Sequence, residues 1–395
     1  MSRLWDKGAP LDERVLRYTA GEDHRLDERL VACDVRASIA HAEMLNTCGL
    51  LGDDDLAAIR DGLTRLGESH AAGDWHIGLA DEDGHTALER RLTDAIGEAG
   101  GRVHLGRSRN DQVLAALRLY LKDAAATLAT GAESLAAALD RLAERQGEVE
   151  LPGYTHLQQA MPSSVALWAG GFAAALRDDA EGLRAAGRRI DRNPLGSAAG
   201  YGTPGLPLDR RQTADALGFA EVEEPVTAVQ LSRGKAESGL LFEITLTLQD
   251  TARLAADLLL FYTQEFSYVS LPEAFTTGSS IMPQKRNPDV LELARAAPAT
   301  AQACLDECLM VTAKLTSGYH RDLQRLKPPL FRGIDLADDT LVIMAALVDG
   351  VAFRPENIRL DSGVHAAGEA NRLVTEQGIP FREAYRRVAR KLSEH

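Results

Sequence analysis

Residues 278–289, which read GSSIMPQKRNPD, combine side chains that could do chemistry on an anionic substrate. Asn287 suits a helix N-cap, Pro288 suits the first helical position, and the free N–H groups of such a helix start bind anions. The loop before the predicted helix carries Ser279 and Lys285. This arrangement suits a reaction in which a hydroxyl loses its proton beside a carboxylate. From composition alone, an ordinary loop-to-helix junction is an equally good interpretation.

Residues 101–113 form a second candidate, because GRVHLGRSRNDQV holds three arginines and a histidine. So many charges cannot all be buried without partners. A solvated basic loop is the simplest interpretation. The more specific interpretation is a carboxylate-binding site, since a guanidinium binds a carboxylate through two parallel hydrogen bonds.

Three further segments carry polar residues next to predicted helices. They are DEDGHTALE at residues 81–89, GYTHLQ at residues 153–158 and SGYHRDLQRLKP at residues 317–328. Taken singly, these segments are typical of a helix start, a loop between helices and a helix end, respectively.

Together these five motifs resemble the fumarase/aspartase superfamily, and most closely its argininosuccinate lyases. The motifs follow the family's order and cover almost the full length of the chain. The resemblance implies elimination of fumarate from argininosuccinate to give arginine, a step of arginine biosynthesis. The substrate would then be a small molecule, and the sequence gives no sign of a metal site or an organic cofactor.

The resemblance also implies roles for particular residues. The catalytic residues that it implies are Ser279, His156, Lys285 and Glu292. The substrate-binding residues that it implies are His85, Thr86, Ser108, Arg109, Asn110, Thr155, Asn287, Tyr319, Gln324 and Lys327. In this scheme His156 handles a proton at the leaving nitrogen and is oriented by Glu292. Which of Ser279 and His156 is the base stays open, with Ser279 preferred because it lies on the loop that resembles the family's closing loop.

A serine hydroxyl is ordinarily far too weak an acid to serve as a base. A cationic neighbour, helix-end amides and exclusion of water would all have to lower the pKa of Ser279. Closure of residues 267–286 over bound substrate is the expected way to assemble these conditions.

Two departures from the family pattern stand out. Gly21 occupies the place where the family commonly has a substrate-binding serine, so that contact is expected to be lost or made by backbone amides. The region after Phe353 is shorter than in most members.

Two rival functions are considered. Another lyase of the superfamily is the nearest rival, chiefly adenylosuccinate lyase. That lyase usually has histidine where this chain has Gln284, and is not expected to carry the set of Tyr319, Gln324 and Lys327. A non-catalytic, crystallin-like structural protein is the rival from another class. Retention of Ser279, His156, Lys285 and Asn287 together argues against it.

Long helices are expected to position these motifs, because apolar residues recur at steps of three, four and seven. The expected helices cover about residues 114–142, 163–189, 232–264, 288–315 and 335–351, and no strand of useful length is expected. The predicted fold is therefore all-α, with a long central helical bundle at residues 107–352 and smaller helical domains at residues 1–106 and 353–395.

The expected helix at residues 232–264 is apolar around nearly its whole circumference. Such a helix must be surrounded by other helices, which several copies of the chain could supply. We therefore expect a homo-oligomer, and the resemblance implies a tetramer with active sites shared between subunits.

Composition narrows the choice of partners. The 395 residues include 44 Lys and Arg against 58 Asp and Glu, a net charge of −14, which argues against nucleic acid. No apolar run is long enough to cross a bilayer, so no membrane partner and a cytoplasmic location are expected. The four cysteines lack the spacing of a zinc site and are expected to be reduced thiols.

Overall fold

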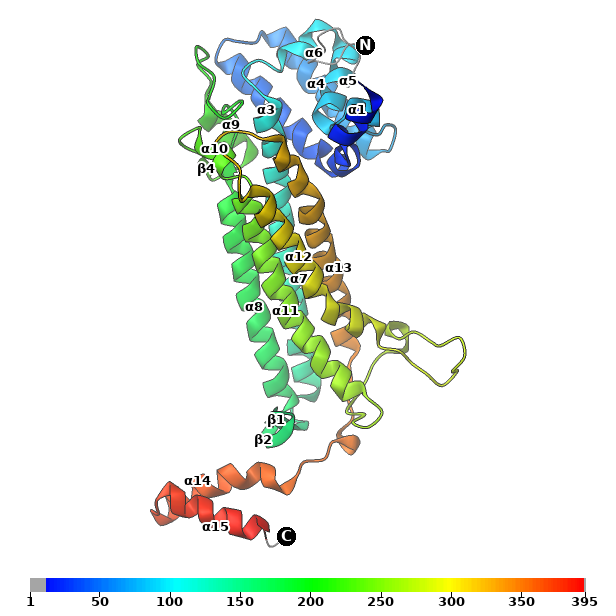
Figure 1. The fold of residues 1–395 in the computed structure, drawn as a ribbon, viewed down its shortest axis with the longest axis vertical. Coiled ribbons are helices and arrows are strands. Elements are labelled where there is room, and N and C mark those ends of the chain that lie inside the picture. Colours follow the sequence, from blue (N-terminus) through cyan, green and yellow to red (C-terminus); the bar gives the residue numbers. More distant parts are fainter. Residues whose placement is uncertain (1–11, 394–395) are drawn as a thin grey trace. The chain divides into compact units, whose positions relative to one another are not determined.

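The computed structural model describes residues 12–393, and helices make up most of this length (Figure 1). The prediction of an all-α fold is confirmed. The five long helices are α7 (Arg109–Gln146), α8 (Val165–Ile190), α11 (Lys235–Tyr262), α12 (Asp289–Thr312) and α13 (Lys327–Gly350). In α7 the leucines spaced by seven from Leu114 to Leu142 are all buried, as the heptad-like pattern predicts.

Helix α13 begins earlier than expected, at Lys327 instead of Asp335. The expectation treated Pro328 and Pro329 as helix breakers. Both lie in the first turn of α13, where the N–H that proline lacks would have no intrahelical partner. Lys327 is thereby fixed at the start of a helix.

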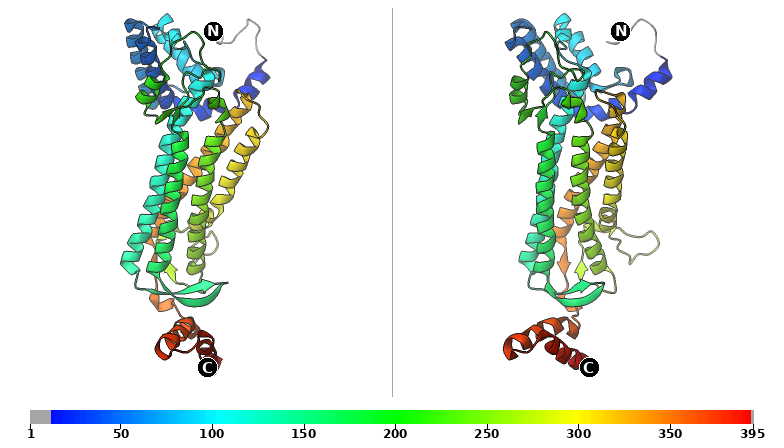
Figure 2. Two further views of the ribbon diagram at one scale, coloured as in Figure 1. Left: turned by 90° about the vertical axis from the view of Figure 1, so that its left-hand side faces the viewer. Right: turned by 60° about the vertical axis from the view of Figure 1, so that its left-hand side comes forward.

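By packing, the described chain forms two compact units. Unit 1 comprises residues 12–127, 183–243 and 302–335, and unit 2 comprises residues 128–182, 244–301 and 336–393. Within each unit, stretches of the long helices run side by side (Figure 2). The domain boundaries expected after residues 106 and 352 remain a prediction.

Unit 1 contains most of the shorter helices and one parallel strand pair. The helices are α1 (Glu13–Ala20), α2 (Asp23–Leu26), α3 (Val31–Thr47), α4 (Asp53–Ala71), α5 (Gly84–Ile96), α6 (Glu98–Arg102), α9 (Arg210–Leu217) and α10 (Ala228–Leu231), and the strands are β3 (Arg192–Asn193) and β4 (Glu221–Val222). Short 3-10 helices occur at η1 (Asp27–Leu30), η2 (Leu79–Asp81) and η4 (Arg321–Leu326).

Helices α3, α4 and α5 share one apolar core. Leu45, Ile59, Leu63 and Leu92 are each 1% exposed or less within this cluster. Full burial of such a side chain stabilises the fold by about 1.5–3 kcal/mol relative to exposure. This core holds the starts of α3 and α5 in place. Helix α5 supplies His85 to the site described below, and α3 supplies Asp34, which anchors His85.

Unit 2 contains a β-hairpin that the sequence pattern did not predict. Strands β1 (Glu150–Thr155) and β2 (Gln158–Ser164) pair antiparallel, with Glu150 opposite Ser164 and an irregularity between Gly153 and Tyr154. Figure 2 shows this hairpin between α7 and α8. The expectation that no useful strand would form is wrong here. The sequence pattern could not indicate these strands, because each contains a proline and neither alternates apolar with polar residues.

The rest of unit 2 consists of short elements after α11 and α13. Strand β5 (Val269–Ser270) pairs antiparallel with β6 (Ala352–Phe353), and 3-10 helices occur at η3 (Glu273–Phe275), η5 (Pro355–Asn357) and η6 (Ser362–His365). Helices α14 (Ala366–Gln377) and α15 (Phe381–Ser393) form a final hairpin around a small apolar core. Among residues 12–393, no helix is both long enough and apolar enough to cross a membrane.

Candidate active site

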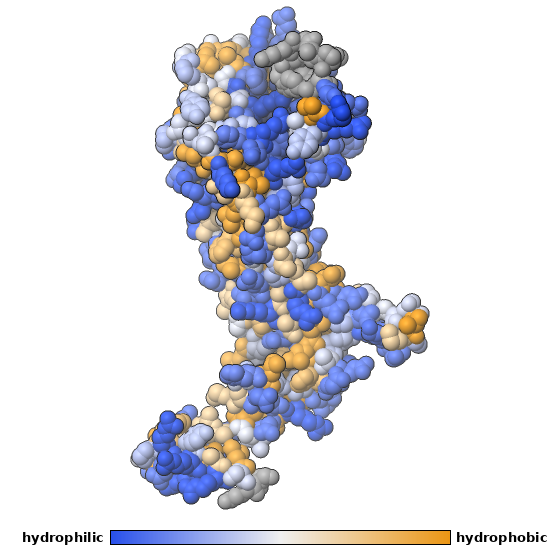
Figure 3. Space-filling model, viewed as in Figure 1, coloured by the Kyte–Doolittle hydropathy of each residue, from blue (hydrophilic) through white to orange (hydrophobic). Residues whose placement is uncertain are grey.

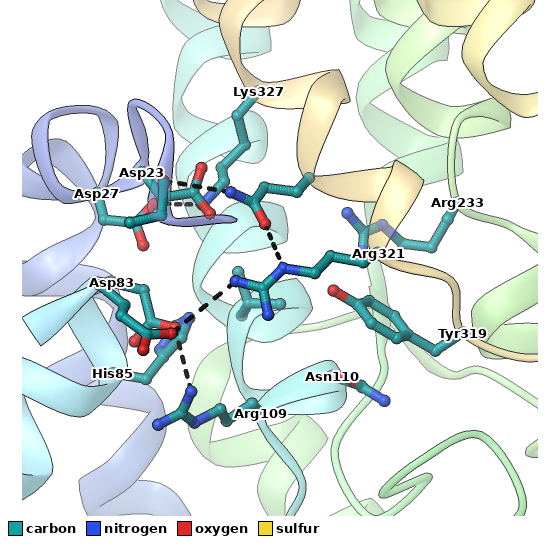
Figure 4. Close-up of a pocket in the computed structure, with 14 residues that line it drawn as sticks. Asp23, Asp27, Asp83, His85, Arg109, Asn110, Arg233, Tyr319, Arg321 and Lys327 are labelled. Atoms are coloured by element: carbon teal, nitrogen blue, oxygen red, sulfur yellow. Dashed lines mark hydrogen bonds and ion pairs between the residues drawn. The ribbon is translucent and has the colours of Figure 1, made fainter. Parts of the chain in front are cut away.

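Unit 1 contains a cavity of 160 Å³ in which charged side chains from distant parts of the chain meet. Figure 4 shows residues of the N-terminal region, the first turn of α7 and the segment before α13 around it. Six residues implied by the sequence resemblance line this cavity: His85, Arg109, Asn110, Tyr319, Gln324 and Lys327.

Lys327 joins α13 to the N-terminal region. Its Nζ atom lies 2.6 Å from Asp27 Oδ1 and 3.0 Å from Asp23 Oδ2. Asp23 and Asp27 are four residues apart on consecutive helical turns, a spacing that places them on one face. Burial alone would lower the pKa of Lys327, but attraction by Asp27 and Asp23 raises it above its usual value.

Two carboxylates compete for this one ammonium group. Burial, together with repulsion from Asp27, raises the pKa of Asp23 to about 6 despite its contact with Lys327. The acidic side of the cavity also carries Glu82 and Asp83. This side can therefore accept a cationic group of a ligand.

His85 lies in the first turn of α5, and its ring is anchored on α3. Nδ1 of His85 lies 2.7 Å from Asp34 Oδ2, and both side chains are buried. Burial alone would lower the pKa of His85, but Asp34 raises it above its usual value. Burial alone would raise the pKa of Asp34, but His85 lowers it.

Asp83 is the N-cap of α5. Its Oδ1 atom accepts hydrogen bonds from the backbone N–H of Thr86 at 2.9 Å and from Thr86 Oγ1 at 2.7 Å. The Thr86 hydroxyl therefore belongs to a helix cap, and a contact of Thr86 with substrate stays a prediction.

The first turn of α7 supplies the basic side of the cavity. Arg109 Nη1 lies 3.7 Å from Asp83 Oδ2, which leaves most of its donors free for a ligand. Ser108 caps this helix, with Oγ accepting from the N–H of Asn110 at 3.3 Å. Asp111 accepts from the N–H groups of Ser108, Gly196 and Ala198, and its burial raises its pKa to about 6.

The segment before α13 closes the cavity opposite α7. Gln324 Nε2 donates to the carbonyls of Thr19 at 2.8 Å and Ala20 at 3.2 Å. Arg321 Nε donates to Gln324 Oε1 at 3.1 Å. The N-terminal segment around Gly21 thus supplies carbonyl acceptors to Gln324, and backbone amides of that segment facing a ligand stay a prediction.

Several lining residues were missed from the sequence, and four of them carry charges that the site uses. These four are Asp23, Asp27, Arg233 and Arg321. The spacing of Asp23 and Asp27 by four residues and the position of Arg321 inside the SGYHRDLQRLKP motif could have indicated three of them. Arg233 has no such signal. Its guanidinium is buried and pairs with Glu237 at 3.3 Å, and its Nη1 atom has no hydrogen-bond partner among residues 12–393.

The other implied residues lie in unit 2. Thr155 ends β1, and His156 lies in the tight turn of the hairpin, exposed and with a φ of 54°. Glu292 is exposed in the first turn of α12. No hydrogen bond joins His156 to Glu292 in the part of the chain that the structure describes, so the orienting role of Glu292 stays a prediction.

Ser279 and Lys285 lie in an exposed loop of unit 2. Ser279 Oγ accepts from the N–H of Met282 at 3.2 Å, and the N–H of Lys285 donates to the Met282 carbonyl at 3.0 Å. These contacts fold the loop into consecutive turns, in which Ser279 is half-buried and Lys285 is exposed.

The predicted helix start after this loop needs a correction. Helix α12 begins at Asp289, one residue later than expected, and the Pro288 carbonyl accepts its first backbone hydrogen bonds. Asn287 does not cap the helix. It pairs with Thr277 in an isolated bridge, and its Nδ2 atom donates to the Gly278 carbonyl at 3.3 Å. The bridge holds Asn287 outside the helix.

The described residues thus form two groups of candidate site residues. The unit 1 group can bind a small ligand that bears both carboxylates and a cationic part, because acidic and basic side chains face one cavity. The unit 2 group offers the hydroxyl of the half-buried Ser279 together with the exposed ammonium of Lys285 and imidazole of His156. Within residues 12–393, no group of three or more His, Cys, Asp or Glu side chains is arranged to hold a metal ion.

Comparison with known proteins gives close relatives over nearly the whole chain. A family model described as lyase matches residues 12–302. The chain is 48% identical to an argininosuccinate lyase of Sorangium cellulosum over 393 residues, covering 99% of this chain and 91% of that one. It is 43% identical to an argininosuccinate lyase of Stenotrophomonas maltophilia over 390 residues, covering 98% of this chain and 90% of that one.

Solved structures share the fold. An EDDS lyase variant with bound fumarate has a TM-score of 0.81 and 25% identity, covering 98% of this chain and 76% of that one. A class II fumarase from Schistosoma mansoni has a TM-score of 0.79 at 17% identity, covering 96% and 93%.

Proposed function

Because the chain belongs to the lyase family, and within it to the argininosuccinate lyases, we propose that it eliminates fumarate from argininosuccinate and releases arginine. The near-complete match to proteins of this name carries the proposal. It makes the protein a carbon–nitrogen lyase with a small-molecule substrate. The cavity of unit 1 supports it, because argininosuccinate bears several carboxylates and also cationic groups.

The chemistry requires fixed positive charge. Removal of a C–H proton beside a carboxylate builds negative charge on that carboxylate, and prearranged donors are the largest source of its stabilisation. Arg109, Arg233 and Arg321 can bind carboxylates on the basic side of the cavity. Asp23 and Asp27 can bind the cationic part of the arginine moiety.

Ser279 and His156 are the proposed pair for proton transfer, with Lys285 as the nearby cation and Glu292 as the partner of His156. The proposed substrate contacts from unit 2 are those of Thr155 and Asn287. The exposed position of the loop around Ser279 fits a segment that closes only over bound substrate. The assignment of base and acid between Ser279 and His156 stays open.

A homo-oligomer with shared active sites is part of the proposal. Large apolar side chains are exposed along the long helices, and Figure 3 shows apolar patches there and at the end of the Ser279 loop. The residues are Phe242, Leu246, Ile281, Leu293, Leu309 and Met310. Exposed apolar patches mark sites of protein association. The tetramer and the cytoplasmic location stay predictions.

An assay of fumarate release by ultraviolet absorbance tests the function. The full chain should release fumarate from argininosuccinate and not from adenylosuccinate. Ser279→Ala should keep the fold and lose activity by at least about 10²-fold, the usual contribution of a positioned proton-transfer group.

Each alternative gives a different result. Fumarate from adenylosuccinate would favour the related lyase, and no fumarate from either substrate would favour a structural protein. Near-normal turnover by Ser279→Ala would refute the role of Ser279 without affecting the proposed reaction.

A further inference from the structure

A network of hydrogen-bonded, buried polar side chains runs through unit 1 to the wall of the cavity. Arg107 Nη1 donates to Ser38 Oγ at 2.8 Å, and Ser38 Oγ donates to Asp34 Oδ1 at 3.2 Å. Gln112 Nε2 donates to Asp34 Oδ1 at 3.0 Å, and His85 Nδ1 lies 2.7 Å from Asp34 Oδ2. All five side chains belong to residues that are at most 8% exposed.

This network ends at a ring nitrogen of His85 that has no hydrogen-bond partner among the described residues. His85 lines the cavity, and its Nε2 atom is buried and makes no hydrogen bond with the described protein. Figure 4 shows the His85 ring next to Asp83 at the edge of this cavity. Buried polar atoms are nearly always hydrogen-bonded. A ligand in the cavity is the natural partner of Nε2.

We propose that Asp34 is a positioning residue that holds His85 as a charged imidazolium, with its Nε2–H donating to a carboxylate of the ligand. Asp34 accepts a hydrogen bond from Nδ1–H of His85, which fixes the orientation of the ring. Ser38 and Gln112 occupy other lone pairs of Asp34, so the carboxylate cannot rotate away from the ring. The choice of a succinyl or fumarate carboxylate as the acceptor rests on the proposed function.

The charges around the ring favour the imidazolium. Asp34 faces it from α3, Asp83 from the cap of α5 and Asp27 from η1, and all three raise the pKa of His85 against the effect of burial. Each of these acids also faces a cation: Arg107 lowers the pKa of Asp34, Arg109 lowers that of Asp83, and Lys327 pairs with Asp27. Since both ring nitrogens of an imidazolium are donors, Nε2 requires an acceptor, and an anionic acceptor gives the stronger hydrogen bond.

Fumarate binding measured by calorimetry on the full chain, from about pH 7 up to the highest pH at which the protein stays folded, tests the proposal. Wild-type affinity should fall as the pH rises through the raised pKa of His85. In Asp34→Asn the pKa falls, so affinity should already be about tenfold weaker near pH 7 and the step should move to lower pH. His85→Asn should lose the step. In assays of turnover, Asp34→Asn should raise KM more than it lowers kcat.

Asp54→Asn is the matched control, because it makes the same change of side chain at an exposed position of α4, outside the buried network around Asp34. It should keep the wild-type step. His41, another buried histidine, does not contribute, because burial lowers its pKa to about 3. Asp23 has a pKa of about 6 and titrates below the measured range.

A flat wild-type profile, or the same profile in Asp34→Asn, would overturn the proposal. The wild-type profile keeps the test decisive even if Asp34→Asn does not fold. Because binding is measured without turnover, a protein that binds fumarate with this profile but does not cleave argininosuccinate would contradict the proposed function alone.

Discussion

Asp23 is a residue whose charge disfavours the unliganded fold. Its carboxyl has a pKa of about 6 in the folded protein, against an ordinary value of 3.8, because it is buried and faces Asp27. A raised folded-state pKa contributes stability that is fully present below the unfolded value and lost as the pH rises through the folded one. Above about pH 6, the ionised Asp23 therefore costs stability, and a cationic group of a ligand would offset that cost.

We predict that Asp23→Asn stabilises the unliganded protein at about pH 7.5. The neutral amide avoids the cost of the buried charge, while Lys327 keeps Asp27 as its partner. A pKa difference of about two units corresponds to at most about 3 kcal/mol, or a rise in Tm on the order of 2–3 °C. Thermal unfolding followed against pH should show the gain shrinking by about pH 5, where wild-type Asp23 is protonated.

Glu22→Gln is the control for this measurement. Glu22 pairs with Arg25 at the surface, with side chains 55% and 68% exposed, so its loss should change stability by less than about 1 kcal/mol. A lower Tm for Asp23→Asn at pH 7.5 would show that attraction by Lys327 outweighs the cost of burial.

Only some of the cavity residues could be identified from the sequence. Arg109 and Lys327 were identified because they stand in motifs that resemble a known family. Asp23 and Asp27 were missed, because their importance depends on Lys327, which lies 300 residues from Asp27 in the chain. Arg233 was missed for the same reason, since burial and an unpartnered nitrogen are properties of the folded structure.

At the scale of elements, the long helices were predictable and the hairpin was not. Leu128 and Leu135 of α7 are both buried, as their spacing predicts. The start of α13 was misplaced because the sequence alone does not show whether a proline ends a helix or begins one. Hairpin β1–β2 is set by a turn whose residues are atypical for such turns.

That turn is strained. His156 and Leu157 both have positive φ, of 54° and 58°. Two-residue hairpin turns with two positive φ values ordinarily use Asn and Gly, and other L-residues there cost about 1–2 kcal/mol each. Strain of this kind concentrates at functional sites, which fits the proposed proton-handling role of His156.

We predict that Leu157→Gly stabilises the protein by about 0.5–1 kcal/mol, because glycine adopts a positive φ without steric cost. The Leu157 side chain is 80% exposed, so little packing is lost. Leu157→Ala keeps Cβ and should give no gain. Denaturant unfolding of both variants tests this. If both variants instead lose the same amount of unfolding free energy, the Leu157 side chain is packed against another copy in the assembled protein.

At the scale of the whole molecule, the residues proposed for one reaction fall into two groups. The cavity group lies in unit 1 and the group with His156 and Ser279 lies in unit 2. We predict that each active site takes its cavity from one copy of the chain and its proton-handling residues from other copies. Closed symmetry of a homo-oligomer would then repeat the same complete site in every position.

Mixing two inactive variants tests this arrangement. Arg109→Ala and His156→Ala should each be inactive alone, whereas hybrids assembled from equal amounts should regain up to about one quarter of wild-type fumarate release, because chance pairs an intact cavity with an intact His156 at that frequency. A mixture of Arg109→Ala with Asn110→Ala is the control, since both changes affect the same cavity. It should stay inactive. If hybrids verified by differently tagged copies show no more activity than this control, the active site is built from a single copy.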